Sequence, residues 1–232
     1  GLGTVTAAMA IGGYTTGTLP LAVETYDGTS WSVDTNLPLG RINIVQGGTT
    51  SAAVIWGGQA PPIWTYLDNT LIWNGSTWTE VADMVTAGWA DGAGFGTSTA
   101  AIAAGGAATP SATIVATTEL WDGTSWTVVN SLHTARATSS GCGSTTAGLV
   151  VGGAAAYPSP PPAAFYAVTE EYDGTSWTEV ANLATGRYDQ GQGPNCPNTN
   201  SVIWGGSASG SPYSNIVEEW TSGAAVVTFT SS

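Results

Sequence analysis

The chain has 232 residues, 42% of them hydrophobic, which is enough to bury a core and excludes an intrinsically disordered protein. Charged residues make up only 8%, against roughly 25% in an average globular domain. Three arginines and no lysine stand against 16 acidic residues, so the formal net charge is −13. Because binding to phosphates needs clustered basic side chains, this balance excludes nucleic acid as a partner.

The same composition argues against a membrane protein. No apolar run approaches the roughly 18 residues that a membrane-spanning helix needs, and no polybasic patch would hold anionic lipid, so we expect no membrane insertion. A surface rich in Thr, Ser and Gly is typical of a soluble extracellular or particle-surface protein. The first residue is glycine and no signal peptide follows, so we expect a processed or excerpted chain.

The first forty residues contain the elements of one repeat in order. A Gly-x-Gly triplet at residues 1–3 precedes a short apolar strand over 7–11, which ends on a Gly-Gly pair. A further strand leads to Tyr26, and the Asp-Gly pair behind it predicts a tight β-hairpin turn. Trp31 then begins the last strand. We expect four short strands per repeat and no helix.

This order recurs along the whole chain. The Gly-Gly pairs are separated by 45, 48, 47 and 53 residues, and each begins 11 residues after the start of its triplet. The fifth copy is degenerate, with Pro194-Asn-Cys196 as its triplet and Trp220-Thr-Ser-Gly in place of the turn, so only four turns are complete. The pairs begin at Gly12, Gly57, Gly105, Gly152 and Gly205. We therefore predict one all-β domain over 1–232, a five-bladed β-propeller of four-stranded antiparallel blades. The predicted blades cover about 1–40, 41–87, 88–135, 136–186 and 187–232.

The ends of the repeat array give a further expectation. If the Gly-x-Gly triplet is the turn after the first strand, Gly1 already lies beyond that strand. The last residue, Ser232, matches Ala184 of the preceding repeat. The prediction therefore includes an incomplete first blade and a ring whose closure depends on a strand from elsewhere.

The repeat resembles a known pattern. Gly-Gly after an apolar strand, then an aromatic residue, a turn and a Trp, is similar to the Kelch blade. Residues 169–187 (TEEYDGTSWTEVANLATGR) with VVGG at 150–153 resemble Kelch-like repeats in virion proteins of tailed bacteriophages. The resemblance covers essentially the whole chain and implies a non-enzymatic structural protein on the virion surface, as a capsid decoration or a tail or fibre appendage. It implies other virion proteins or a host receptor or glycan as partners, with a homo-oligomer left open.

Several residue types recur at fixed places in the repeat, and we interpret them as structural. The tryptophans that begin the fourth strands pack between blades in this interpretation; they are Trp31, Trp78, Trp126 and Trp177. A glutamate stands two residues before the aromatic in four blades, as Glu24, Glu119, Glu170 and Glu218. The arginines follow last strands, as Arg41, Arg136 and Arg187. We expect repeated Glu–Arg ion pairs, with Glu119 and Arg136 as one pair; a buried pair broken on one side is costly.

The connections between second and third strands differ in length and carry aromatic residues, so they form the candidate binding face. These residues are Tyr14, Trp64, Tyr66, Tyr157, Phe165, Tyr166 and Tyr213. Part of each connection could instead be third strand packed on its neighbour. A secreted lectin-like module is the alternative function, but it should repeat one sugar pocket per blade. Trp64 and Tyr66 have no counterparts in other blades, which favours a single asymmetric protein contact.

No catalytic, cofactor or metal site is expected. His133 is the single histidine, which excludes a metal site built on several histidines. The turn aspartates could hold calcium, but local hairpin hydrogen bonds explain them better; they are Asp27, Asp122 and Asp173. Cys142 and Cys196 lie at corresponding places in adjacent blades, so a disulfide between them stays open.

Overall fold

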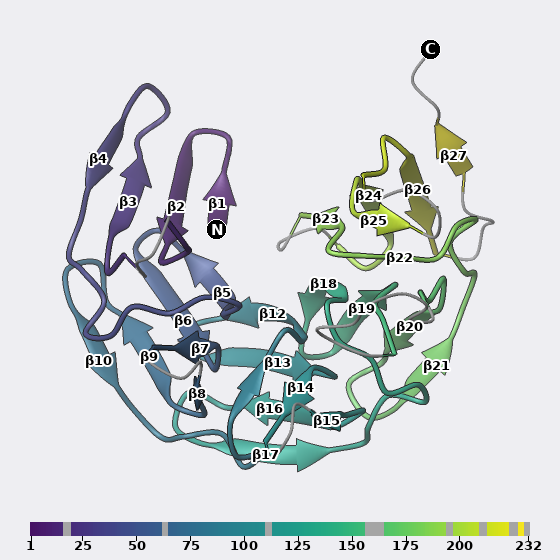
Figure 1. The fold of residues 1–232 in the computed structure, drawn as a ribbon, viewed down its shortest axis with the longest axis horizontal. Helices are drawn as coiled ribbons and strands as arrows, with labels where there is room; N and C mark the ends of the chain where they lie inside the picture. Colours follow the sequence, from purple (N-terminus) through teal and green to yellow (C-terminus); the bar gives the residue numbers. More distant parts are fainter. Residues whose placement is uncertain are drawn as a thin grey trace.

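The computed structural model describes residues 1–15, 20–61, 65–109, 113–155, 165–193, 197–208, 213–222 and 227–229. Within these ranges it contains strands and no helix, and so no helix that could cross a membrane. Five four-stranded antiparallel sheets follow one another in chain order and are arranged as an arc around a common axis (Figure 1).

The sheets are numbered 1 to 5 along the chain. Sheet 1 contains β1 (Leu2–Thr4), β2 (Ala7–Ile11), β3 (Val23–Tyr26) and β4 (Trp31–Val33). Sheet 2 contains β5 (Val45–Thr49), β6 (Ala52–Trp56), β9 (Thr70–Trp73) and β10 (Trp78–Glu80). Sheet 3 contains β12 (Ala93–Thr97), β13 (Ala100–Ala104), β16 (Thr118–Trp121) and β17 (Trp126–Val129). Sheet 4 contains β18 (Ser140–Ser144), β19 (Ala147–Val151), β20 (Thr169–Tyr172) and β21 (Trp177–Glu179). Sheet 5 contains β23 (Gly191–Gln192), β24 (Asn200–Trp204), β26 (Val217–Thr221) and β27 (Val227–Phe229).

Each sheet is a meander that begins at the axis. Its first strand is innermost, and neighbouring first strands contact one another in the series β1, β5, β12, β18 and β23. The expectation of a missing strand was wrong, because all five sheets have four strands. The physical reason is the place of the Gly-x-Gly triplet: it lies inside the first strand rather than in the turn after it, as Gly94 and Gly96 do in β12.

The last glycine of this triplet is required by the backbone. Gly96 has a φ of 120°, and a Cβ atom there would lie 2.3 Å from the carbonyl oxygen of Ala100 on the next strand. Gly3, Gly48 and Gly143 repeat this geometry. Only glycine adopts such a φ without strain, so the triplet fixes where the first strand bends into the second.

The core consists of clusters between neighbouring sheets. Second strands alternate, so Ala53 and Ile55 of β6 pack toward sheet 1 while Val54 and Trp56 pack toward sheet 3. One such cluster fills each of the junctions 1–2, 2–3, 3–4 and 4–5. Figure 1 shows sheets 1 and 5 apart at the two ends of the arc. The described residues contain no cluster that joins these two sheets.

The recurring tryptophans pack in these junctions between sheets, as predicted. Trp126 lies against the aromatic residue of its own hairpin, Trp121, with a ring-centroid distance of 5.5 Å, and against Trp56 of the preceding sheet at 5.2 Å. Its Nε1 donates to Thr70 Oγ1 of that sheet at 2.8 Å. Trp177 repeats this with Thr118 Oγ1 at 3.1 Å. Trp31 departs from the pattern, because no sheet formed by the described residues lies on its outer side, and it is 52% exposed.

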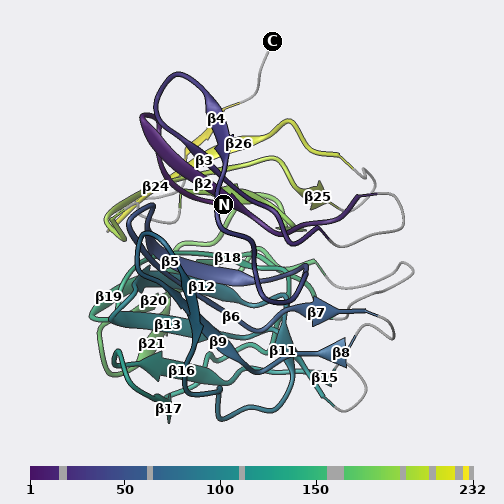
Figure 2. The same cartoon turned by 90° about the vertical axis from the view of Figure 1, so that its left-hand side faces the viewer.

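Small additional sheets form at one side of the arc, where the second-to-third connections lie (Figure 2). They comprise β7 (Gln59–Ala60) with β8 (Thr65–Tyr66), β11 (Trp89–Ala90) with β14 (Ala107–Ala108) and β15 (Thr113–Ile114), and β22 (Arg187–Tyr188) with β25 (Ser207–Ala208). In sheet 4, isolated bridges link Ala137, Ala154 and Phe165 in the same way. The alternative interpretation of these connections as strand therefore holds for part of them.

Candidate functional site

The connectors, the segments that join the fourth strand of one sheet to the first strand of the next, hold the arginines. Arg136 donates from Nη2 to Glu170 Oε1 at 3.0 Å, and Arg187 donates to Glu218 in the same manner. Both pairs are fully buried. The expected ion pairs therefore exist, but the pairing of Glu119 with Arg136 was wrong. Each arginine reaches the sheet that follows its connector, because the connector lies over the face of that sheet.

Two junctions lack one member of the pair. Arg41 precedes sheet 2, where Leu71 replaces the glutamate, and it donates instead to Asn69 Oδ1 at 2.8 Å. Trp89 takes the place of the arginine before sheet 3 and is buried. Glu119 of that sheet accepts hydrogen bonds from the backbone N–H groups of Val85 and Thr86 at 2.8 and 2.7 Å. Burial lowers the pKa of Arg41 to about 10, so the guanidinium remains charged at neutral pH.

His133 belongs to the same kind of contact. Its backbone N–H donates to Glu170 Oε2 at 2.8 Å, and its ring Nδ1 lies 3.0 Å from the same oxygen. Glu170 thus has a histidine, an arginine and the backbone of the connector as neighbours. The histidine contact is not predictable from the repeat pattern, because His133 and Glu170 lie 37 positions apart.

The turn aspartates satisfy their own hairpins, as predicted. Asp122 Oδ1 accepts from the N–H groups of Thr124 and Ser125, both at 2.8 Å, and Asp27 and Asp173 repeat this arrangement. These hydrogen bonds lower the pKa of the three carboxyl groups. Asn74 accepts the equivalent bonds in sheet 2, so the turn needs a side-chain oxygen rather than a charge.

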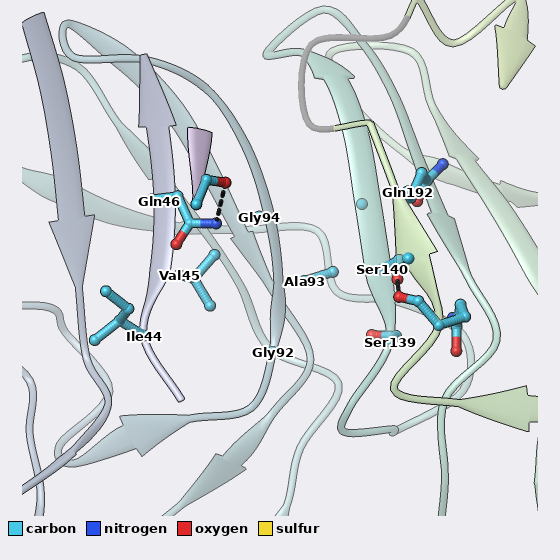
Figure 3. A pocket seen from close by; sticks show the side chains of 13 residues that line it. Ile44, Val45, Gln46, Gly92, Ala93, Gly94, Ser139, Ser140 and Gln192 are labelled. Carbon is cyan, nitrogen blue, oxygen red and sulfur yellow. Dashed lines mark hydrogen bonds between the residues drawn. The ribbon is translucent and has the colours of Figure 1, made fainter. Parts of the chain in front are cut away.

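The axis of the arc contains a polar pocket of about 370 Å³ between the innermost strands. Figure 3 shows Val45 and Gln46 on one side of it and Ser139, Ser140 and Gln192 on the other. Gln46 Nε2 donates to the carbonyl oxygen of Gly1 at 3.2 Å, and Ser140 Oγ donates to that of Gln190 at 2.5 Å. An adjoining pocket of about 270 Å³ shares several of these residues.

Four residues with left-handed backbone line this adjoining pocket, one from each connector. Asn43, Asp91, Thr138 and Asp189 have φ values of 56°, 59°, 54° and 53°. The N–H of each later residue donates to the carbonyl of the one before it, at 3.4, 2.5 and 3.0 Å in chain order. Asn and Asp tolerate this conformation better than most residues, which explains their recurrence here.

The pocket brings together polar groups that had no assigned role. Burial, helped by the charge of Asp189, raises the pKa of Asp91 to about 7, and burial also raises the pKa of Asp189. Ser139 Oγ, Gln190 Oε1 and Asp91 Oδ2 are buried atoms without a hydrogen-bond partner. The repeat position that Asp91 and Asp189 share becomes visible only when the connectors are aligned. Among the described residues no group of three His, Cys, Asp or Glu side chains could hold a metal ion.

The candidate binding face is only partly visible. Trp64 and Tyr157 lie outside the described residues. Tyr66 is in β8 and Phe165 packs on Tyr188 with ring centroids 5.0 Å apart, so both are part of the additional sheets. Tyr166 belongs there too, since its N–H donates to Gly153.

The other two predicted aromatic residues, Tyr14 and Tyr213, are 61% and 87% exposed. The disulfide that the sequence left open falls partly outside the described residues, because Cys196 is not among them. Cys142 is buried, with its Sγ 3.8 Å from Ser201 Oγ.

Comparison with known proteins agrees with the arrangement of the sheets. The solved structure of YjhT, a Kelch-like β-propeller, superposes with a TM-score of 0.80 over 97% of this chain and 81% of that chain, at 15% identity. The chain has a β-propeller fold. At this identity the likeness concerns the fold alone. No family model matches the sequence, and no curated protein matches it.

Proposed function

We propose that the chain is a non-enzymatic structural or binding protein of a tailed-phage virion, and that its five sheets are Kelch-like propeller blades. The observation that carries the proposal is which side chains are buried and which are exposed. Arg41, Arg136 and Arg187 are all buried in sheet junctions, whereas the loop face presents Tyr14 and Tyr213 to solvent. Exposed aromatic residues on loops are enriched in protein interfaces. The protein would dock on other virion proteins or on a host surface, as a capsid decoration or a tail or fibre appendage.

Purified particles of the phage that encodes the chain provide the test. We expect the protein in the particle proteome, and gold-labelled antibody against it on the particle surface. A Tyr14→Ser, Tyr213→Ser double variant should lose incorporation while its thermal unfolding stays unchanged. Val128→Ser, at an exposed residue of the outermost strand β17, is the matched control and should incorporate normally. Particles that lack the protein altogether would contradict the proposal.

A lectin-like role makes a different prediction. It requires one equivalent sugar pocket per blade, whereas the polar pocket on the axis is lined by residues from several sheets together. A glycan array with the purified chain separates the two functions, since saturable binding to one glycan class would favour the lectin.

A further inference from the structure

The two end faces of the arc carry residues that inner sheets bury. On sheet 5, Val202 and Trp204 are each 46% exposed, although the residues at the same repeat positions, Val54 and Trp56 in sheet 2, are fully buried. On sheet 1, Trp31 is half exposed and Glu24 is exposed, whereas Trp177 and Glu170 at the same positions are buried. Large apolar side chains exposed at positions that other sheets bury are typical of interaction surfaces.

The identities on these faces specify what would cover them. Sheet 3 lies between Trp56 of sheet 2 on one side and Glu170, Tyr172 and Trp177 of sheet 4 on the other. The open face of sheet 5 presents Trp204 where sheet 2 has Trp56. The open face of sheet 1 repeats the set of sheet 4 residue by residue, with Glu24, Tyr26 and Trp31. The open faces at the two ends of the arc therefore present the same kinds of residue that contact sheet 3 from its two sides.

The buried glutamates add a charge requirement. Glu170 accepts from the Arg136 guanidinium and from the N–H groups of His133 and Thr134, all supplied by the connector that precedes its sheet. Glu218 accepts from Arg187 and Ala184 in the same way. Glu24 occupies the same repeat position as Glu170 and Glu218. The connector that would contact it precedes sheet 1 and would belong to the polypeptide that covers the open face of that sheet. A covering sheet must therefore bring a connector with donors for a carboxylate.

We propose that the gap between sheets 5 and 1 is occupied by a sixth sheet of the same repeat type, resembling sheet 3 and its following connector, supplied by polypeptide other than residues 1–232. The size agrees with the comparison above, since about a fifth of YjhT lies outside the match, an amount comparable with one of the five matched repeats. The sixth sheet buries Trp31 and Trp204, and its connector pairs an arginine with Glu24.

A duplication within the chain itself tests this. Residues 89–140, which comprise sheet 3 and the connector with Arg136, are placed ahead of Gly1, so that Ser140 joins Gly1 as it normally joins Gly141. Hydroxyl-radical footprinting with mass spectrometry then reports the oxidation of each tryptophan. We expect Trp31 and Trp204 to be oxidised readily in the original chain. In the fusion, their oxidation should fall to the level of Trp177 and Trp56, the buried counterparts in the same molecule.

A substitution isolates the connector contact. Glu24→Gln should leave the melting temperature of the original chain unchanged and lower that of the fusion. Three outcomes would overturn the proposal. In the first, Trp31 and Trp204 are already protected in the original chain and the chain is a monomer, which means that its own ends close. In the second, they are protected and the chain is a dimer, which means that a second copy covers them. Sedimentation distinguishes the monomer from the dimer. Alternatively, both tryptophans could stay accessible in the fusion while the duplicated sheet melts separately.

Discussion

At the scale of single residues, the buried ion pairs show how one junction is held. Arg136 and Glu170 are both fully buried, and the glutamate has further donors from the connector. Removing one partner leaves an uncompensated charge in the core, whereas removing both leaves only a packing defect. The ion pair thus holds the connector on the sheet that follows it. Its contribution to the stability of the fold depends on both side chains.

A double-mutant cycle measures this coupling. Glu170→Leu and Arg136→Leu alone should each lower the free energy of unfolding by about 3–5 kcal/mol. The double variant should lose much less than the sum of the two. Urea denaturation gives all four values. Glu24→Leu, at the exposed position of the same repeat column, is the control, with an effect within about 0.5 kcal/mol. Strictly additive losses would show that the two side chains act independently.

The pocket aspartate predicts a dependence of stability on pH. The pKa of Asp91 is about 7 in the folded chain and near 3.8 when unfolded, so between these values the folded state holds a proton that the unfolded state has lost. The stability contributed by this group is therefore complete below pH 3.8 and declines as the pH rises to about 7. A pKa unit corresponds to about 1.4 kcal/mol, so the decline is on the order of a few kcal/mol.

Asp91→Asn should remove this decline and make the chain more stable than the parent at pH 8, as followed by chemical denaturation from pH 4 to 8. Asp122→Asn is the control. Its turn accepts an Asn, as Asn74 shows, and the pKa of Asp122 is lowered rather than raised, so the decline between pH 4 and 7 should persist. An unchanged profile in Asp91→Asn would mean that the carboxyl is charged in the folded protein.

At the scale of the elements, one repeat position has two surroundings. Trp126 packs against two other tryptophans and donates to a buried threonine, whereas among the described residues Trp31 packs against the ring of Tyr26, at 5.3 Å. Trp126→Ala should therefore cost about 3–5 kcal/mol, as large core truncations do. Trp31→Ala should cost well under half of that. Thermal unfolding of both variants checks the comparison, and equal losses would show that Trp31 is covered in solution.

The repeat pattern predicted the elements of the fold well, because each signature has a local cause. The Asp-Gly turns, the alternating strands and the glycines with positive φ depend on neighbours in the chain. The first strand was misplaced by a few residues because a triplet of glycines suggests a turn, although here it lies in a strand that bends. The partner of Arg136 was misassigned because a connector belongs to two repeats at once.

The pocket was harder to predict from the sequence. Asp91 and Asp189 come from connectors 98 positions apart and meet only because the connectors converge on the axis. The other two connectors have an asparagine and a threonine at this repeat position, so no single residue type identifies it in the sequence. The left-handed backbone that these residues share is visible only in the structure.

At the scale of the whole molecule, the sheets form a series in which each contacts its neighbours. Such a chain of interfaces opens most easily at its ends. We expect amide hydrogen exchange to be slowest in β13 and β16 of sheet 3 and fastest in β2, β3, β24 and β26 of the end sheets. The sixth-sheet fusion should slow exchange in sheets 1 and 5 selectively. Uniform protection in the original chain would instead indicate a closed ring.

The match between the two ends and the surroundings of sheet 3 also concerns how such a gene can change. Trp56 and Trp204 occupy the same repeat position, as do Glu24 and Glu170, so these sides of a junction match between the repeats that carry them. Unequal recombination between copies whose junction residues match would insert or delete one whole repeat and give the new junction a compatible partner, whereas the copies with Leu71 and Trp89 lack the matching side chain. Between such matching copies, repeat number is open to variation by a single genetic event.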